Sequence, residues 1–316
     1  MQTPNLAKDG GRWKGVAQLA YFFPRFFSIR GDAGFMPYFC RMEPTNPAML
    51  TDEEKLSYDR FREEVLNDFR VACISRETSL LGRKEVLGGK AKFGIFGDGK
   101  ELAQVAMAKF FRPGDFRSGY YRDQTFMLAA GLATAEQIFA QLYANPDTTQ
   151  EPFSGGRQMN CHFATRMVDE QGNWLGLSGL KNVSSDIAPT AGQMPRALGL
   201  AFASKAFRSI EQLHAFPQLS HNGNEVCFAT IGDASTSEGH FWETLNAAGV
   251  LQVPLAVFVW DDGYGISVPK KYQTTKASIS AALSGLERTD ETNGILIYKV
   301  KGWDYAGMCE AFEEGI

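Results

Sequence analysis

Residues 225–269 read EVCFATIGDASTSEGHFWETLNAAGVLQVPLAVFVWDDGYGISVP, and we take this stretch as the key to the fold. It contains two apolar runs of strand length, Glu225 to Ile231 and Pro254 to Trp260. A segment that suits a helix, Ser237 to Val250, lies between them. Nearly continuous apolar strands joined by a helix indicate a parallel βαβ unit, because parallel strands need a crossover connection and are covered on both faces.

An acidic residue follows each of the two expected strands. Asp233 comes just after the first strand and Asp262 just after the second. Because the carboxyl ends of parallel strands meet at one edge of the sheet, where such folds bind ligands, we expect the two carboxylates to converge there. Magnesium prefers hard oxygen ligands, often one or two carboxylates with phosphate oxygens and water. The pattern therefore predicts a magnesium site, although in isolation it also fits a helix cap and a turn residue.

The start of the intervening helix carries small polar residues. Ser235 and Glu238 form an S-x-x-E pattern that is typical of a helix N-terminus. Free backbone N–H groups and the positive end of the helix dipole would then face the same edge of the sheet. A diphosphate that is held by these amides and bridged to magnesium fits this arrangement.

The remaining sequence predicts further elements around this unit. We expect helices over residues 51–76, 101–111, 134–144 and 193–207, a short strand over 119–123, and a strand and helix over 295–300 and 303–315. Residues 84–100 are glycine-rich and residues 145–190 show few periodic signals, so both are expected to be loops. A long loop in a compact domain is usually functional or covered by a partner. Together these elements predict an α/β domain over residues 51–316, with a doubly wound, mostly parallel sheet flanked by helices.

The two ends of the chain differ from this domain. Residues 1–50 are rich in aromatic residues, glycine and proline, and we interpret them as an irregular N-terminal arm that packs on another surface, such as a partner subunit. The last expected helix stops at Ile316 without a cap, which favours a chain that is part of a longer polypeptide.

Composition excludes several classes of function. The net charge of −4 and the pI of about 5.7 argue against a nucleic-acid partner and against a polybasic membrane surface. The apolar stretch near the N-terminus is interrupted by Pro24 and Arg25 and is too short to span a bilayer. The five cysteines, which contain no CxxC pair, favour reduced thiols in a cytoplasmic protein; they are Cys40, Cys73, Cys161, Cys227 and Cys309.

The segment from residue 232 onward resembles the thiamine diphosphate motif, and more closely the α chain of the 2-oxo acid dehydrogenases. The matching elements are GD at residues 232–233, then SEG, LN and DDGY-IS. The resemblance implies that Asp233, Asp262 and the backbone carbonyl of Tyr264 hold magnesium. It also places Ala234 and Ser235 on the diphosphate of the cofactor.

Three upstream motifs match the same family in the same order. YRD at residues 121–123 resembles a Tyr-Arg pair, which implies that Tyr121 and Arg122 bind the cofactor and that the arginine grips the diphosphate. GRQMNCH resembles a loop that ends in an active-site histidine, which implies a catalytic role for His162, although a lone histidine is often structural. APTAGQMPRALG implies cofactor contacts for Ala188 and Thr190. The resemblance covers roughly residues 52–316 and is closest to the type in which α and β halves are fused.

The chain departs from the family pattern at three positions. Ala234 stands where glycine is usual, so it must accept the backbone angles of that site. Asp262 replaces the usual asparagine and adds a negative charge beside a diphosphate, which only the metal and basic groups such as Arg122 can offset. Trp260 stands where some relatives carry an arginine for the diphosphate.

The resemblance implies oxidative decarboxylation of a 2-oxo acid and transfer of the acyl group to the lipoyl group of a partner acyltransferase. This chain would supply the diphosphate and magnesium half of the site, and a β half or subunit would complete it in a dimer or an α2β2-like assembly. Ile95 and Phe96 would suit an apolar acyl group and favour a branched-chain substrate over pyruvate. The alternatives are an acetoin dehydrogenase, a transketolase-like carboligase, or a non-catalytic assembly module of the same fold.

Overall fold

The computed structural model describes residues 17–22 and 52–316, with side chains from residue 58 onward. The strands are β1 (Ala17–Phe22), β2 (Phe116–Ser118), β3 (Asn182–Val183), β4 (Cys227–Gly232), β5 (Leu255–Asp261), β6 (Tyr264–Gly265), β7 (Val268–Pro269) and β8 (Leu296–Lys301). The α-helices are α1 (Asp52–Leu87), α2 (Glu101–Lys109), α3 (Gln124–Ala129), α4 (Ala135–Leu142), α5 (Gln193–Ser209), α6 (Gly239–Leu251), α7 (Ile279–Leu283) and α8 (Tyr305–Gly315).

The main sheet has the strand order β3-β2-β4-β5-β1-β8. Strands β3, β2, β4 and β5 are parallel to one another, and Gly232 of β4 is paired with Trp260 of β5. Strand β1 is antiparallel to both of its neighbours, β5 and β8. Residues 17–22 of the expected arm thus lie in the sheet, and the remainder of residues 1–50 lies outside the described residues. The α/β fold, with a sheet that is mostly parallel, agrees with the sequence-based expectation.

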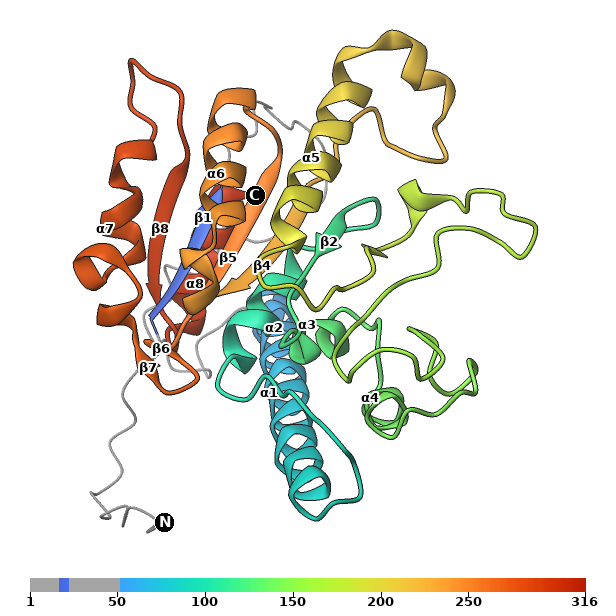
Figure 1. The fold of residues 1–316 in the computed structure, drawn as a ribbon. Helices are drawn as coiled ribbons and strands as arrows, with labels where there is room; N and C mark the ends of the chain where they lie inside the picture. Colours follow the sequence, from blue (N-terminus) through green and yellow to red (C-terminus); the bar gives the residue numbers. More distant parts are fainter. Residues whose placement is uncertain (1–16, 23–51) are drawn as a thin grey trace.

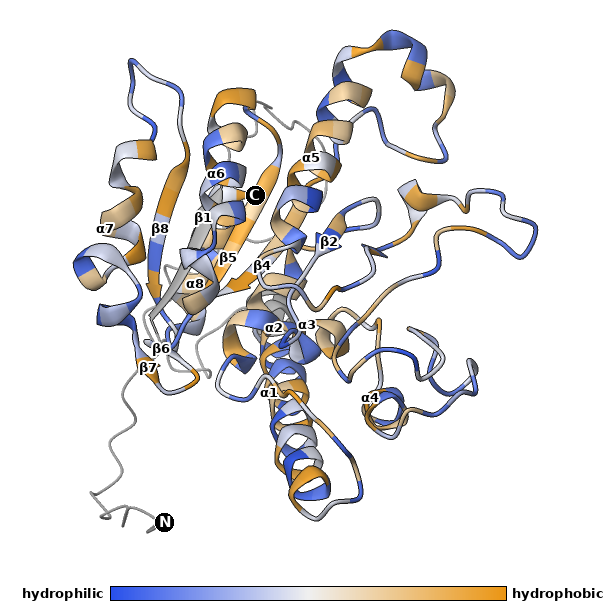
Figure 2. Cartoon of the chain, in the orientation of Figure 1, coloured by the Kyte–Doolittle hydropathy of each residue, from blue (hydrophilic) through white to orange (hydrophobic). Residues whose placement is uncertain are grey.

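Alternate residues of the central strands enter two separate cores. Phe228, Phe258 and Trp260 pack on one face of the sheet with apolar residues of α2, α3 and α8. Ala229 and Val257, from the same two strands, pack on the other face with α5, α6 and α7. Figure 2 shows that β4 and β5 are hydrophobic along their length, as expected for strands covered on both sides. Helices therefore flank the sheet on both faces (Figure 1).

Helix α1 is longer than expected, since it continues past Arg76 to Leu87. The reason is tertiary: the side chain of Gln124 donates hydrogen bonds to the hydroxyl groups of Ser75 and Ser79, at 3.1 and 2.8 Å. Polar residues that would favour a helix end at a surface are here buried against α3. The helix ends before Gly88-Gly89, where Gly89 has a φ of +75°.

The strand expected over residues 119–123 was misplaced. The strand is β2, three residues earlier, and residues 119–123 form a turn after it. A Cβ atom at Gly119 would lie 1.9 Å from the guanidinium carbon of Arg117, so only glycine allows the chain to wrap around that side chain. The turn is therefore dictated by a buried arginine that local sequence patterns do not reveal.

Two negative findings hold for the described part of the chain. None of its helices is long and apolar enough to cross a bilayer. Its four cysteines, Cys73, Cys161, Cys227 and Cys309, are all free thiols, and Cys40 lies outside the described residues.

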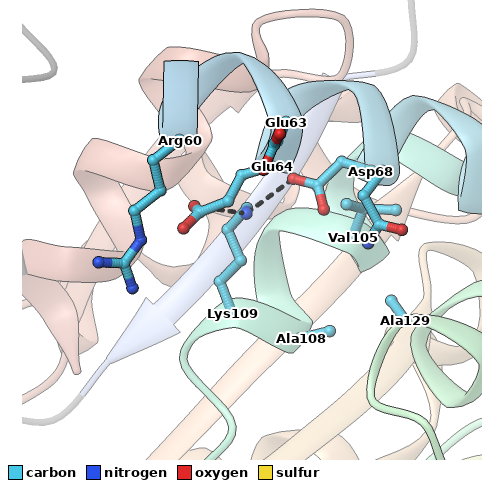
Figure 3. A pocket seen from close by; sticks show the side chains of 9 residues that line it. Arg60, Glu63, Glu64, Asp68, Val105, Ala108, Lys109 and Ala129 are labelled. Atoms are coloured by element: carbon cyan, nitrogen blue, oxygen red, sulfur yellow. Dashed lines mark ion pairs between the residues drawn. The ribbon is translucent and has the colours of Figure 1, made fainter. Parts of the chain in front are cut away.

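A polar surface pocket of about 460 Å³ lies between α1 and α2 (Figure 3). Lys109 points into it and forms ion pairs with Asp68 at 2.7 Å and Glu64 at 3.7 Å. Lys109 ends α2, whereas the sheet-edge site described below meets the beginning of this helix. The pocket is therefore separate from that site.

Candidate functional site

The two acidic residues singled out in the sequence lie at the same edge of the sheet. Asp233 follows β4 and Asp262 follows β5, and these strands are parallel neighbours. The N–H of Gly263, the residue after Asp262, donates a hydrogen bond to Oδ2 of Asp233 at 3.0 Å. The N–H of Tyr264 donates to Oδ1 of Asp262 at 3.1 Å. The loop after β5 thus holds both carboxylates, together with the backbone of Tyr264, in one small region.

The carboxylates at this edge have different partners. Asp261 is paired with Lys270, with Nζ–Oδ2 at 2.5 Å, and Asp262 with Lys100, with Nζ–Oδ2 at 3.2 Å. Within residues 58–316, no lysine or arginine lies within ion-pair distance of the buried Asp233. Asp233 therefore has no ion pair of its own in this part of the chain, and the field of Lys270, which is paired with Asp261, offsets its charge only in part.

The electrostatic environment of Asp233 reflects this imbalance. Burial, followed by repulsion from Asp262 and Asp261, raises the pKa of Asp233 to about 6. A bound divalent cation would remove this penalty by replacing lost hydration and repulsion with direct coordination. A buried carboxylate without a cationic partner fits a metal ligand.

The raised pKa of Asp233 predicts a pH dependence of stability in the ligand-free protein. Between the ordinary aspartate pKa and about 6, the folded state holds a proton that the unfolded chain has released, so stability falls as the pH rises through this window. Asp233→Asn lacks this group, and we expect the wild type to lose stability relative to it by on the order of 1 kcal/mol between pH ~4 and pH ~7. Thermal denaturation of both proteins across this range measures the difference; parallel curves would contradict the assignment.

The helix that follows Asp233 does not begin as the sequence suggested. A 3-10 helix, η4 (Ala234–Ser237), comes first, and α6 starts at Gly239 with Glu238 as an N-cap that makes no side-chain capping bond. The expected S-x-x-E cap is therefore wrong. The helix start differs because the hydroxyl of Thr236 donates to the carbonyl of Asp233 at 2.6 Å and closes a tight turn before α6.

Ala234 is accommodated without backbone strain. It lies within η4 and has none of the positive φ angles that would require glycine. Its methyl group faces Gly265, where an added Cβ would lie 2.6 Å from the Cβ of Ala234. At this contact, position 265 is therefore the one that must be glycine. Ser235, the residue after Ala234, is buried at the sheet edge.

The Tyr-Arg pair lies after β2, at the same edge of the sheet. The guanidinium of Arg122 lies over the rings of Tyr120 and Tyr121, at 5.4 and 5.0 Å from their centroids, and donates a hydrogen bond to the hydroxyl of Tyr120. Burial disfavours its charge, but Tyr120, Tyr121 and Asp262 outweigh burial and raise the pKa of Arg122. The structure thus places Arg122 in the field of Asp262, as an anion-binding arginine at this site requires.

A buried ion cluster holds this pair in place, and sequence reasoning missed it. Arg117 is fully buried and binds Asp123 at 2.6 Å and Asp186 at 3.1 Å. Asp123 also accepts hydrogen bonds from the backbone of Tyr120 and from the indole of Trp260, at 3.2 and 3.1 Å. Trp260, which stands where some relatives carry an arginine for the diphosphate, is a core residue that supports Asp123.

His162 is buried with one ring nitrogen unused. Its Nδ1 contacts the carbonyl of Asn160 at 3.3 Å, and its Nε2 has no hydrogen-bond partner within the described structure. The ring is stacked on Tyr121, with centroids 6.3 Å apart and planes at 11°. If Nδ1 carries the proton that Asn160 accepts, Nε2 is free to accept a proton from a ligand. The neighbouring Cys161 thiol is buried, which raises its pKa to about 12 and disfavours the thiolate that a nucleophile needs at neutral pH.

Ala188 and Thr190 lie in the loop between β3 and α5 and are both exposed. This loop leaves the carboxyl end of β3, which is parallel to β2, and α5 is tied to the sheet by Gln193, whose amide donates to the carbonyl of Thr230 at 2.8 Å. The loop therefore lies along the same sheet edge as the Tyr-Arg pair.

Lys100 is a site residue that the sequence analysis missed. It immediately precedes α2, and its buried side chain reaches Asp262, which is 162 positions away. The only available signal was a lysine in a glycine-rich loop that leads into a helix. Such a lysine is usually solvated, so local sequence patterns offer no reason to single it out.

Ile95 and Phe96, expected to suit an apolar acyl group, have different environments. Phe96 is buried in a small core with Ala91 and Leu142. Ile95 is joined to the loop of His162, since its N–H donates to Asn160 Oδ1 at 2.9 Å and its carbonyl accepts from Asn160 Nδ2 at 2.6 Å. Of these two residues, only Ile95 therefore lies beside the loop of His162, where it could contact an acyl group.

The donor set at the sheet edge suits a metal that takes part of its coordination from a ligand. The described residues contain no group of three or more His, Cys, Asp or Glu side chains that could hold a metal ion by themselves. Asp233 and Asp262 would thus need a backbone carbonyl, such as that of Tyr264, with phosphate oxygens and water, which is the coordination typical of magnesium bound with a phosphate ligand.

Comparison with known proteins places this geometry in a family context. The model of the "Dehydrogenase E1 component" family matches residues 71–314. The chain is similar to the 2-oxoisovalerate dehydrogenase subunit alpha of Bacillus subtilis, with 29% identity over 232 residues, 73% of this chain and 58% of the relative.

Two further relatives are similar to overlapping parts of the chain. The mitochondrial 2-oxoisovalerate dehydrogenase subunit alpha of Caenorhabditis elegans is 30% identical over 185 residues, 58% of this chain and 36% of the relative. The pyruvate dehydrogenase E1 component subunit alpha of Acholeplasma laidlawii is 26% identical over 263 residues, 83% of this chain and 62% of the relative. The chain thus spans less than two thirds of the length of each of these relatives.

Proposed function

The chain belongs to the dehydrogenase E1 component family, and on this premise we propose that it is the α-type part of a thiamine diphosphate-dependent 2-oxo acid dehydrogenase. The observation that carries the proposal is the gathering of Asp233, Asp262 and Arg122 at one edge of the sheet. Two carboxylates for a metal and a cation for a diphosphate are the groups that such a cofactor requires.

The residues at this edge divide the binding between them. Asp233, Asp262 and the carbonyl of Tyr264 would hold magnesium, and the backbone of Ala234 and Ser235 would contact the diphosphate. Arg122 would balance the charge of the phosphate oxygens, with its orientation fixed by Tyr120. Tyr121, Ala188 and Thr190 would contact the organic part of the cofactor.

The proposed reaction draws on the bound cofactor and on side chains of this chain. Thiamine diphosphate, when bound, supplies stabilisation of the negative charge that remains when carbon dioxide leaves a 2-oxo acid. His162, with Nε2 unpaired and directed by Asn160, would hold or accept a proton near the reacting carbon. The acyl group would then pass to the lipoyl group of a partner acyltransferase. A branched-chain substrate is supported by Ile95 beside the histidine loop and by the relatives named for 2-oxoisovalerate.

A second polypeptide half is part of this proposal. The hairpin β6–β7 follows Asp262 and exposes apolar side chains next to the site, among them Tyr264, Ile266 and Val268. Exposed apolar groups beside a polar site favour burial by a partner surface, here a β half or subunit in a dimer or an α2β2-like assembly. A cytoplasmic location stays a prediction from cysteine usage.

Calorimetric titration of thiamine diphosphate into the chain, with and without magnesium, tests the cofactor assignment. We expect binding that requires magnesium. The thermal midpoint should rise with ligand concentration, because a ligand at a hundredfold excess over Kd adds about 2.7 kcal/mol to the free energy of unfolding. Binding that is equal with and without magnesium would contradict the metal site. The absence of binding under both conditions would contradict the cofactor assignment and favour a non-catalytic assembly module.

A further inference from the structure

Lys100 is buried far more deeply than a lysine beside a helix start usually is. Its side chain is 7% exposed, and its Nζ lies 3.2 Å from Oδ2 of Asp262, which is 37% exposed. A buried ammonium group is unfavourable unless a negative group compensates it. The burial of the Lys100 ammonium group is therefore compensated by its ion pair with Asp262.

The surrounding contacts fix the segment that carries Lys100. Glu101 forms a bidentate pair with Arg76, at 2.6 and 2.8 Å, and also accepts a hydrogen bond from the N–H of Gly99 at 2.9 Å. A Cβ atom at Gly97 would lie 2.2 Å from the carbonyl oxygen of Arg122, so the loop packs directly on the Tyr-Arg turn. Lys100 is thus held by rigid backbone between Arg122 and Asp262.

The pairing of Lys100 with Asp262 changes the net charge of the site. Where the family resemblance predicts a neutral asparagine, the chain carries Asp262, which adds a negative charge beside the expected diphosphate. The ammonium group of Lys100 cancels this added charge, so the Lys100–Asp262 pair has the same net charge as a neutral residue. Since like charges repel strongly at a partly buried site, an aspartate without this lysine would weaken the binding of an anion.

We propose that Lys100 is a positioning residue of the cofactor site, which neutralises and orients Asp262 so that an aspartate can serve beside the diphosphate of thiamine diphosphate. This inference rests on the proposed function. It predicts that Lys100 matters for the cofactor only as long as position 262 is an aspartate.

A double-mutant cycle on the 316-residue chain tests this dependence. Calorimetry would measure the affinity for thiamine diphosphate at fixed magnesium in the wild type, Lys100→Gln, Asp262→Asn and the double variant. We expect Lys100→Gln to weaken binding roughly tenfold in the wild-type background and less than about threefold in the Asp262→Asn background. Lys100→Arg, which keeps the charge, should bind within about threefold of the wild type.

The matched control is Lys109→Gln at the other end of α2. Lys109 forms a similar ion pair, with Asp68 at 2.7 Å, but lies in the separate pocket of Figure 3. We expect this variant to bind the cofactor with the affinity of the wild type.

The outcomes separate the inference from the proposed function. If the wild type binds and Lys100→Gln causes the same loss in both backgrounds, Lys100 acts independently of Asp262 and the inference is overturned, while the proposed function stands. If the wild type shows no magnesium-dependent binding, the proposed function is overturned and the inference with it. A tenfold loss that disappears in the Asp262→Asn background supports both.

Discussion

Asp233→Asn is expected to reduce the affinity of the chain for thiamine diphosphate with magnesium by about a hundredfold or more, and to stabilise the ligand-free protein. Both effects follow from the loss of the negative charge of Asp233. The carboxylate of Asp233 is buried and lies close to Asp262 and Asp261, which raises its pKa to about 6. A neutral amide removes this repulsion, and its oxygen can still accept the N–H of Gly263. A hard cation, however, loses an anionic oxygen ligand, and a neutral amide oxygen is a weaker replacement.

The measurement compares thermal midpoints at pH ~8 with and without the cofactor and magnesium. We expect a higher midpoint for Asp233→Asn without ligand, and almost no further rise when both ligands are added. The control is Asp261→Asn, which removes the same charge at the same strand end but from a carboxylate that is bound to Lys270 at 2.5 Å. This control should lose stability and keep most of the ligand response. An unchanged ligand response in Asp233→Asn would remove Asp233 from the metal site.

The aspartates at this edge of the sheet show which parts of the site could be predicted from the sequence. The strand pair β4–β5 was predictable because each strand is a continuous apolar run with a helix between, and the position of Asp233 and Asp262 after these strands then follows from parallel topology. Which carboxylate lacks a cation was not predictable, because it depends on where the side chains of Lys270 and Lys100 point.

Long-range packing also explains the errors in the secondary structure. Helix α1 extends to Leu87 because Gln124 binds its serine residues. The turn after β2 is set by Gly119 closing over Arg117, a side chain that the distant Asp186 holds in place. Each of these contacts joins a local sequence signal to a side chain elsewhere in space. Propensity and periodicity are local properties, so they identified the elements better than their ends.

The buried Arg117 is the strongest case of such a long-range determinant, and its replacement should have the largest effect on stability. Arg117→Met is expected to lower the free energy of unfolding by about 3–5 kcal/mol, because it leaves Asp123 and Asp186 buried without their shared cation. Urea denaturation monitored by circular dichroism measures this loss. The control is Arg83→Met, which breaks the more exposed pair with Asp98 and should cost less than about 1 kcal/mol.

The same variant connects stability to the site. Asp123 is bound at once by Arg117, by the backbone of Tyr120 and by the indole of Trp260, so the turn that carries Arg122 depends on it. When Arg117 is lost, we expect the Asp123 side chain to shift, and Arg122 to lose its fixed position over the tyrosine rings. Cofactor affinity at low temperature, where Arg117→Met is still folded, should therefore fall as well. A variant that unfolds more easily but binds as tightly as the wild type would show that the buried cluster supports the fold alone and does not position Arg122.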